Sequence, residues 1–293
     1  MISSQLPFAI IRNSGEAQSE HCGLVPWWSI TKTVLAACVL KLTDLGALRL
    51  DDYFENWPFT IRQLLQHTSG LTNYGGPAYQ RAVAAGDAVW SVDALLVRRN
   101  ARRLLFPAGE GWAYSNIGYL LVRQLIERTT GMNLDTALQQ LIYVPLRITS
   151  TRVAMTASDM EQTHWGNPTS YDPRWVFHGL LIGPPTDAAV FLDGLLAGKV
   201  VSVASLAAMQ GERILGGPLP GRPWTQTSYG LGLMIGNMNG AGRVIGHSGV
   251  GHNTVSALYA FLDLPRRPVV ATFAQGTDEG VTEHEAVRLA LVG

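Results

Sequence analysis

A serine and a lysine stand three positions apart, at Ser29 and Lys32, where a strongly apolar segment begins. Residues i and i+3 share one face of an α-helix, so the Lys32 amine would lie within reach of the Ser29 hydroxyl. A serine is a weak nucleophile until a base takes its proton, and a lysine that burial deprives of water can become that base. The pair predicts an attacking serine at a helix N-terminus, where backbone N–H groups could stabilise an oxyanion.

The same pair has a plainer interpretation, in which Ser29 caps the helix and the Lys32 side chain reaches the surface. Only three of the 22 basic residues are lysines, at positions 32, 41 and 199. An arginine could not give up its proton, so the rare lysine stands where the chemistry needs an amine. The pair alone leaves both interpretations open.

A second segment, Tyr114-Ser115-Asn116, precedes an expected helix. A phenol becomes a usable base only beside a positive charge, which Lys32 could provide. Asn116 could offer its amide to a substrate carbonyl. In the alternative interpretation Asn116 is only the helix cap and Tyr114 is a packed aromatic side chain.

A third segment, Gly246-His247-Ser248-Gly249, lies on an expected strand. An imidazole there could hydrogen-bond the base or the substrate, and small neighbours would let a substrate approach, although His247 could equally be a satisfied buried histidine. Ser248 is not expected to be the nucleophile of a Gly-x-Ser-x-Gly elbow, because position 250 is valine and a strand follows instead of a helix. His252 and Asn253 contact substrate or, as we favour, shape a turn.

The 22 basic and 22 acidic residues balance to a formal net charge of zero, and apolar residues make up 47% of the chain. Such a chain predicts a folded core and no binding of nucleic acid or of an anionic membrane. The histidines and cysteines show no metal-ligand spacing, so we expect no metal and no other cofactor.

The first residues carry no basic start of a signal peptide, and the apolar run 33–40 is far shorter than a membrane span. We therefore expect a cytoplasmic protein without a membrane partner. Its partner would be a small-molecule substrate, and its oligomeric state is left open.

Apolar periodicity and turn residues indicate an α+β fold. Strands at both ends of the chain predict one antiparallel sheet built from the termini and flanked by helices, with an all-helical domain inserted. We place the sheet domain at residues 1–45 and 175–293, the helical domain at 46–174, and the active site at their interface. The expected helices are 29–45, 61–67, 91–99, 116–129, 135–143, 186–197, 203–210 and 283–292; the expected strands are 8–11, 17–22, 229–236, 243–249, 254–263 and 269–274.

Taken together, the motifs resemble those of the serine β-lactamase and penicillin-binding protein superfamily, particularly class C β-lactamases, family VIII carboxylesterases and D-amino-acid peptidases. The resemblance spans about residues 25–275. It is carried by segments 28–33, 45–52, 61–71, 106–109, 114–119, 130–131, 229–232 and 246–249.

The resemblance implies a role for each motif residue. Ser29 would be acylated, and Lys32 with Tyr114 would activate it and later a water molecule, with the proton acceptor left open. Asn116 would orient the acyl group, and His247 would stand where β-lactamases carry a lysine. The oxyanion hole would use the backbone N–H groups of Ser29 and of Val250, the residue after Gly249.

The function that follows is a serine hydrolase working through an acyl-enzyme on small esters or amides. Because the lysine that helps to bind a β-lactam carboxylate is replaced by His247, a β-lactamase is disfavoured. The alternatives are a D-amino-acid peptidase, or a weak β-lactamase, with the same site, and a non-catalytic descendant that binds a ligand. Trp27, Trp28 and Trp112 would wall an acyl pocket or simply pack in the core.

Overall fold

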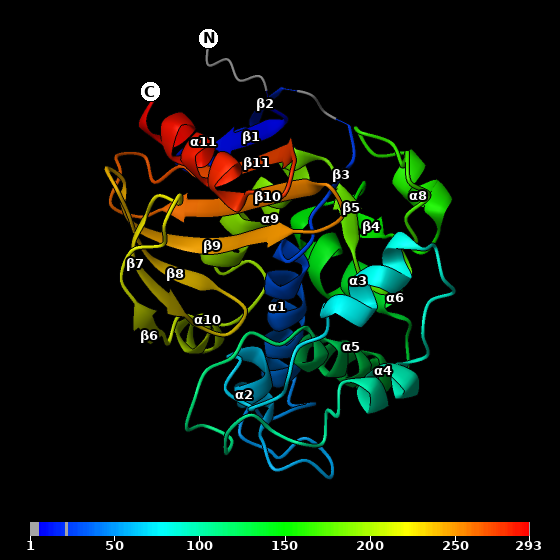
Figure 1. Ribbon diagram of the computed structural model, residues 1–293. Coiled ribbons are helices and arrows are strands. Elements are labelled where there is room, and N and C mark those ends of the chain that lie inside the picture. Colours follow the sequence, from blue (N-terminus) through cyan, green and yellow to red (C-terminus); the bar gives the residue numbers. More distant parts are fainter. Residues whose placement is uncertain (1–5, 21–22, 293) are drawn as a thin grey trace.

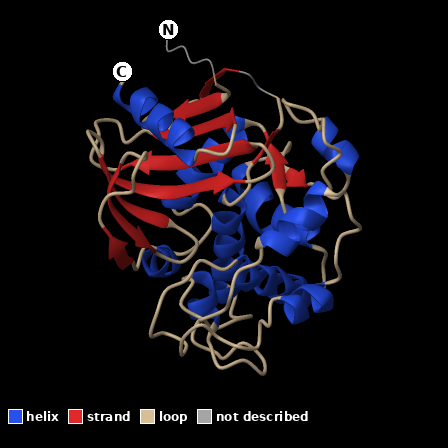
Figure 2. Ribbon diagram, in the orientation of Figure 1, coloured by secondary structure: helices blue, strands red, loops and turns tan. Residues whose placement is uncertain are grey.

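An eight-stranded antiparallel sheet forms the centre of the fold (Figures 1 and 2) in the computed structural model, which describes residues 6–20 and 23–292. The strand order is β2-β1-β11-β10-β9-β8-β7-β6, so the first and last strands of the chain are neighbours. The strands are β1 (Phe8–Ile11), β2 (Gln18–Glu20), β6 (Arg213–Gly216), β7 (Trp224–Tyr229), β8 (Met234–Met238), β9 (Gly242–Val250), β10 (Thr254–Phe261) and β11 (Val269–Gln275).

Both faces of this sheet are covered by helices. Strand β10 is buried along its whole length, because alternate side chains enter two different cores. Tyr259 and Phe261 pack in the core that α11 (Glu279–Leu291) covers, whereas Leu258 faces the larger core shared with α1 (Ile30–Asp44) and α9 (Pro185–Leu196). Figure 1 shows α11 and α9 on opposite sides of the sheet.

Helix α1 runs through the middle of the molecule, between the sheet and the other helices (Figure 1). Twelve of its residues, from Ile30 to Leu42, are buried, which explains why the segment has no polar face. The other helices are α2 (Ile61–Leu65), α3 (Pro77–Ala84), α4 (Val92–Arg98), α5 (Asn116–Thr130), α6 (Leu134–Leu138), α7 (Val144–Leu146), α8 (Ala157–Glu161) and α10 (Val203–Met209), with a π-helical turn Gln139–Tyr143 and a 3₁₀ turn Pro173–Trp175.

A small second sheet connects the first strands to the helical part of the chain. Its order is β3-β5-β4, with β3 (Val25–Pro26), β4 (Arg152–Val153) and β5 (Leu181–Gly183) all antiparallel. The segment between α1 and β5 is mainly helical but contains β4. The division into two domains at residues 45 and 175 stays a prediction.

The expected architecture of a terminal sheet flanked by helices is confirmed, and the two largest errors in element boundaries are in the second half of the chain. The expected strand 229–236 is two strands, β7 and β8, joined by a turn at 230–233, where the Gly230 N–H donates to the Leu233 carbonyl. The last helix begins at Glu279 instead of Glu283, because Asp278 caps it through the N–H of Gly280.

The structure answers the sequence-based expectations about the cysteines and about membrane spans only for the residues that it describes. Cys22 and residues 1–5 lie outside them, whereas Cys38 is a buried free thiol, as expected for a small core residue. In the part of the chain that the structure describes, no helix is long and apolar enough to cross a lipid bilayer.

Candidate active site

Ser29 occupies the first turn at the N-terminus of α1, at the point where β3 ends and the chain enters the core. Trp28 before it has a left-handed backbone with φ +47°, a conformation that costs a bulky residue free energy and turns the serine out of the strand direction. The Ser29 hydroxyl does not cap the helix. Its Oγ lies 2.9 Å from Lys32 Nζ and accepts a hydrogen bond of 2.9 Å from Tyr114.

Lys32 is completely buried, so the interpretation in which its side chain reaches the surface is wrong. Burial lowers the pKa of the Lys32 ammonium well below its ordinary value, because the charged form loses its hydration. Its Nζ lies 5.0 Å from the ring centre of Tyr114 and 5.7 Å from that of Tyr119. Burial thus favours the neutral amine of Lys32, which is the form that can accept a proton.

Tyr114 precedes α5 and reaches Ser29 from the opposite side. Burial raises the pKa of the Tyr114 phenol above its ordinary value, and the hydrogen bond to Ser29 only partly offsets this. The tyrosine is therefore held as a neutral hydroxyl that donates a proton. Of the two bases that the sequence left open, the environment favours Lys32 as acceptor.

Asn116 is the first residue of α5, but it is not the cap of that helix. Ser115 caps α5 through the N–H of Gly118 at 3.0 Å, whereas the Asn116 N–H donates to Asn73 Oδ1 at 3.0 Å. The Asn116 side chain is therefore not needed to begin the helix. It faces the space beside Ser29.

Gly249 explains how β9 approaches the nucleophile. A Cβ atom at this position would lie 2.6 Å from the backbone nitrogen of Ser29 and 2.8 Å from the Cβ of Trp28, which leaves no room for a side chain. The close approach brings the end of β9, Val250, next to Ser29, and both residues line the same space. The two residues expected to form the oxyanion hole are thus neighbours.

His247 lies on β9 and is 1% exposed. Burial, and then the charge of Lys32, lower the pKa of His247 to about 3, so its imidazole is neutral at physiological pH. Its Nδ1 faces the Ser248 carbonyl, which can only accept, and its Nε2 accepts from the Tyr229 hydroxyl at 2.9 Å. Both ring nitrogens therefore have protein partners, and His247 serves as a wall of the site.

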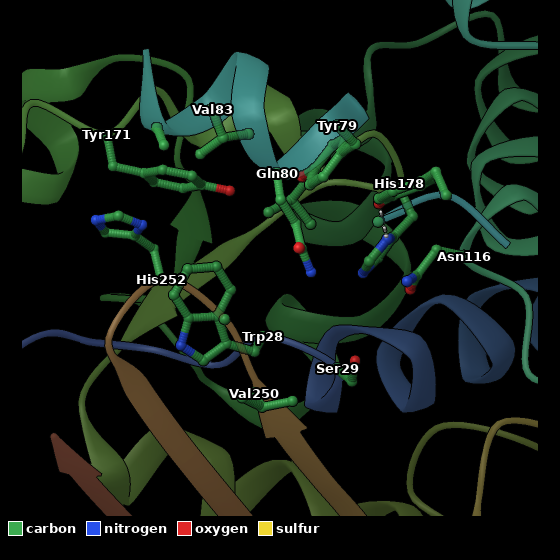
Figure 3. A pocket seen from close by; sticks show the side chains of 15 residues that line it. Trp28, Ser29, Tyr79, Gln80, Val83, Asn116, Tyr171, His178, Val250 and His252 are labelled. Atoms are coloured by element: carbon green, nitrogen blue, oxygen red, sulfur yellow. Dashed lines mark hydrogen bonds between the residues drawn. The ribbon is translucent and has the colours of Figure 1, made fainter. Parts of the chain in front are cut away.

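Two cavities meet at Ser29, Asn116 and Val250, the residues that line both of them. The first, here named the α3 cavity, has about 400 Å³ and is walled by α3 and by aromatic residues. Figure 3 shows Ser29 at its floor, Asn116 and His178 on one side, and Tyr171 with His252 on the other. The second, here named the sheet cavity, has about 660 Å³ and is lined by residues of β6 to β9 and by Trp112, Tyr114, Arg222 and Glu279.

Four residues for which two interpretations were open have defined positions in the structure. Trp27 is completely buried in the core, whereas Trp28 lines the α3 cavity and Trp112 lines the sheet cavity. His252 belongs to the turn between β9 and β10, as favoured, but its ring also stacks on Tyr171 at 4.7 Å and borders the α3 cavity.

Two histidines around Lys32 were not among the site residues predicted from the sequence. His67 packs its ring 4.4 Å from that of Tyr114, and His178 lies 3.2 Å from Lys32 Nζ and from the hydroxyl of Tyr74. Burial lowers the pKa of both histidines well below the ordinary value, with the Lys32 charge as second cause. No sequence spacing signals them, because His178 is 146 residues away from Lys32.

These buried histidines do not form a metal site. Among residues 6–20 and 23–292 there is no group of three or more histidine, cysteine, aspartate or glutamate side chains placed to hold a metal ion.

The model of the family described as Beta-lactamase matches residues 23–292, which includes every site residue described above. The chain belongs to the beta-lactamase family. This confirms the resemblance seen in the motifs. Family members include serine hydrolases that act on esters and amides.

Two curated relatives carry different names. The chain is 27% identical to penicillin-binding protein 4* of Bacillus subtilis (strain 168) over 267 residues, which covers 79% of this chain and 57% of that protein. It is 32% identical to esterase EstB of Burkholderia gladioli over 140 residues, covering 40% and 35% of the two chains. The chain thus spans only part of the length of these relatives.

Solved structures share the fold over almost the whole chain. A D-stereospecific amidohydrolase from Streptomyces sp. superimposes with a TM-score of 0.79 at 23% identity, covering 99% of this chain and 95% of that one. A D-amino acid amidase from Ochrobactrum anthropi SV3 has a TM-score of 0.78 at 21% identity, covering 94% and 89%. At these identities the likeness establishes the fold of a family whose members differ in substrate.

Proposed function

We propose that this beta-lactamase family member is a serine hydrolase that acts through an acyl-enzyme on small esters or amides. One observation carries the proposal: Ser29 Oγ lies 2.9 Å both from a buried amine, Lys32 Nζ, and from the hydroxyl of the half-buried Tyr114. A hydroxyl between a proton acceptor and a proton donor has the arrangement that nucleophilic catalysis needs.

In the proposed acylation Ser29 Oγ forms a bond with the substrate carbonyl carbon while its proton passes to neutral Lys32. The backbone N–H groups of Ser29 and Val250 stabilise the oxyanion. When the bond to the leaving group breaks, Tyr114 gives its proton to that group and regains one from Lys32, so the leaving group gains one proton, Ser29 has lost one, and Lys32 and Tyr114 return to their starting states. A water molecule then replaces the leaving group and the same steps run in reverse to release the acid.

The position of Tyr114 supports a division of the substrate between the two cavities, with the leaving group in one and the acyl group in the other. Tyr114 lines the sheet cavity but is not among the residues that line the α3 cavity, so a leaving group protonated by Tyr114 departs on the sheet side. The acyl group then occupies the α3 cavity, whose walls include Tyr74 and Tyr171. Such walls favour an apolar or aromatic acyl group.

A second candidate is an amidase acting on D-amino-acid derivatives. One structural neighbour is named a D-amino acid amidase and another a D-stereospecific amidohydrolase. The amino group of a D-amino-acid substrate belongs to its acyl part, so it would lie in the α3 cavity, where aromatic ring faces can attract a cation. The chemistry at Ser29 would be the same, so the two candidates differ in the substrate that is turned over.

The test is intact-mass spectrometry after incubation with a fluorophosphonate, p-nitrophenyl acetate or a penicillin. We expect an adduct with the fluorophosphonate or the ester that maps to Ser29 and is absent from Ser29→Ala, whose ester hydrolysis should fall at least about a thousandfold. Ser14→Ala, a change at an exposed serine, is the matched control and should behave like the unmodified protein. Undiminished hydrolysis by Ser29→Ala would falsify the mechanism, and no adduct with any reagent would favour a ligand-binding role.

A further inference from the structure

His178 joins the nucleophile to the wall of the α3 cavity. Its Nε2 lies 3.2 Å from Lys32 Nζ, and its Nδ1 lies 3.2 Å from the Tyr74 hydroxyl. All three residues are buried, and His178 and Tyr74 both line the α3 cavity. Figure 3 shows His178 beside Asn116 in the wall of this cavity. A continuous row of polar contacts therefore runs from Ser29 through Lys32 and His178 to Tyr74.

We propose that His178 is a positioning residue for Lys32: its Nε2 accepts a hydrogen bond from Nζ, which directs the amine lone pair to Ser29 and holds the ammonium formed during acylation. The inference rests on the proposed hydrolase function and deepens it. No bond to His178 forms or breaks, and the proton that leaves Ser29 stays on the path through Lys32 and Tyr114.

The hydrogen-bonding capacity of the three groups fixes the tautomer. A lysine ammonium only donates, so the Nε2 that faces it has to be the unprotonated nitrogen of His178. The proton of the neutral imidazole then lies on Nδ1 and is donated to the Tyr74 oxygen, which can accept it. Tyr74 thereby keeps His178 ready to accept from Lys32 in both protonation states of the amine.

The charges around this row make such an acceptor useful. His67 and His247 are buried neutral rings, and Glu279, the acidic group that acts on Lys32, is paired with Arg222 at 2.9 Å. On the His178 side, Arg123 is paired with Glu127 at 3.1 Å. His178 thus supplies Lys32 with an uncharged acceptor that does not return its pKa to the ordinary value.

The test compares His178→Leu, which removes the acceptor, with His178→Gln, whose side-chain amide can place an acceptor near the position of Nε2. Without an acceptor the Lys32 ammonium is less stabilised, so the pKa of Lys32 falls. The acidic limb of the pH profile of kcat/KM should therefore move to lower pH by about one unit. We expect His178→Leu also to lose about ten- to a hundredfold in kcat. His178→Gln should regain most of both, and Tyr74→Phe should lose less than His178→Leu.

The matched control is Val83→Ala, another change in the wall of the α3 cavity with no polar contact to Lys32. It should change KM and leave the acidic limb in place. The proposal is overturned if His178→Leu keeps the acidic limb of the unmodified protein and changes only KM. It is also overturned if His178→Leu and His178→Gln shift the acidic limb equally. Thermal melts confirm that each variant is folded before its kinetics are measured.

A spectroscopic measurement separates this inference from the proposed function. In ¹⁵N-histidine spectra, the His178 signals are assigned by their absence in His178→Gln, and we expect the neutral Nδ1-protonated tautomer. A neutral ring protonated on Nε2 overturns the inference whatever the protein hydrolyses. Conversely, the expected tautomer in a protein that no reagent acylates at Ser29 overturns the proposed function and leaves the positioning of Lys32 standing.

Discussion

The α3 cavity and the sheet cavity share Ser29, Asn116 and Val250, yet their walls are built differently. Aromatic side chains dominate the first, where the ring of Tyr79 lies 5.3 Å from those of both Tyr74 and Trp175. The second also has aromatic and aliphatic walls, but it adds the charged side chains of Arg222 and Glu279 and hydroxyl groups from β7 and β9. The same nucleophile therefore faces one chamber whose lining, among the described residues, has no carboxylate, lysine or arginine and one that contains an ion pair, which suits an aromatic or apolar acyl group and a leaving group that must be protonated.

The charged part of the sheet cavity is built on one completely buried carboxylate. Glu283 is completely buried and binds Arg222, the indole N–H of Trp224 at 3.0 Å and the hydroxyl of Ser248. Ser248 is the neighbour of His247 on β9, so the ion pair also fixes the strand that carries the site. The α3 cavity relies on ring packing for the same rigidity.

The largest expected effect concerns the amine between the two cavities. Lys32→Met should lower kcat/KM by about a thousandfold, since a general base is lost, and it should raise the melting temperature at pH 7. The reason for the second effect is that the folded-state pKa of Lys32 lies below its unfolded-state value. At pH values between these two pKa values, Lys32 binds a proton in the unfolded chain but not in the folded protein. Binding of that proton stabilises the unfolded state and so disfavours folding.

The gain in stability from Lys32→Met should be largest at pH values below the folded-state pKa of Lys32. It should vanish as the pH rises to the ordinary lysine pKa of about 10.4. Melting curves from pH 6 to 10.5 measure this, with the unmodified protein as reference. A variant that is less stable than the unmodified protein at pH 7 would show that Lys32 is not a destabilising buried group.

The next effect concerns the ion pairs of the sheet cavity. Arg222→Met leaves the carboxylate of Glu283 buried and unpaired, so the free energy of unfolding should fall by about 3–5 kcal/mol. Arg62→Met removes an exposed pair with Asp51 and should cost at most about 1 kcal/mol. Urea denaturation of both variants checks this, and equal losses would mean that the wall of the sheet cavity is not supported by its charges.

Part of this site could be predicted from the sequence because part of it is local. Ser29 and Lys32 meet through helix periodicity alone, whereas Tyr114 reaches Ser29 across 85 residues and was found only through the resemblance of its motif. His178 has neither a local pattern nor a motif. Its role depends on the tertiary packing that brings the segment before β5 against α1, and the sequence alone does not encode that in any short-range signal.

The fold, too, has features that local sequence patterns predict and features that they do not. The sheet and the buried helix follow from apolar periodicity, but the turn at 230–233 was missed since the apolar residues around it read as one continuous strand. Similarly, Thr282 and Glu285 have the spacing of a capping box, and yet Asp278 begins the last helix, where Glu279 can pair with Arg222. Tertiary ion pairs and turns overrode the local signals in both places.

The smallest expected effect tests the division of the site most directly. Val83→Trp narrows the α3 cavity and Leu215→Trp narrows the sheet cavity, and each is assayed with methyl 2-naphthylacetate and with naphthyl acetate. Val83→Trp should lower kcat/KM about tenfold for the bulky acyl group and less than about twofold for the bulky leaving group, and Leu215→Trp should do the reverse. Equal losses on both esters, or the opposite pattern, would contradict an acyl group in the α3 cavity and a leaving group in the sheet cavity.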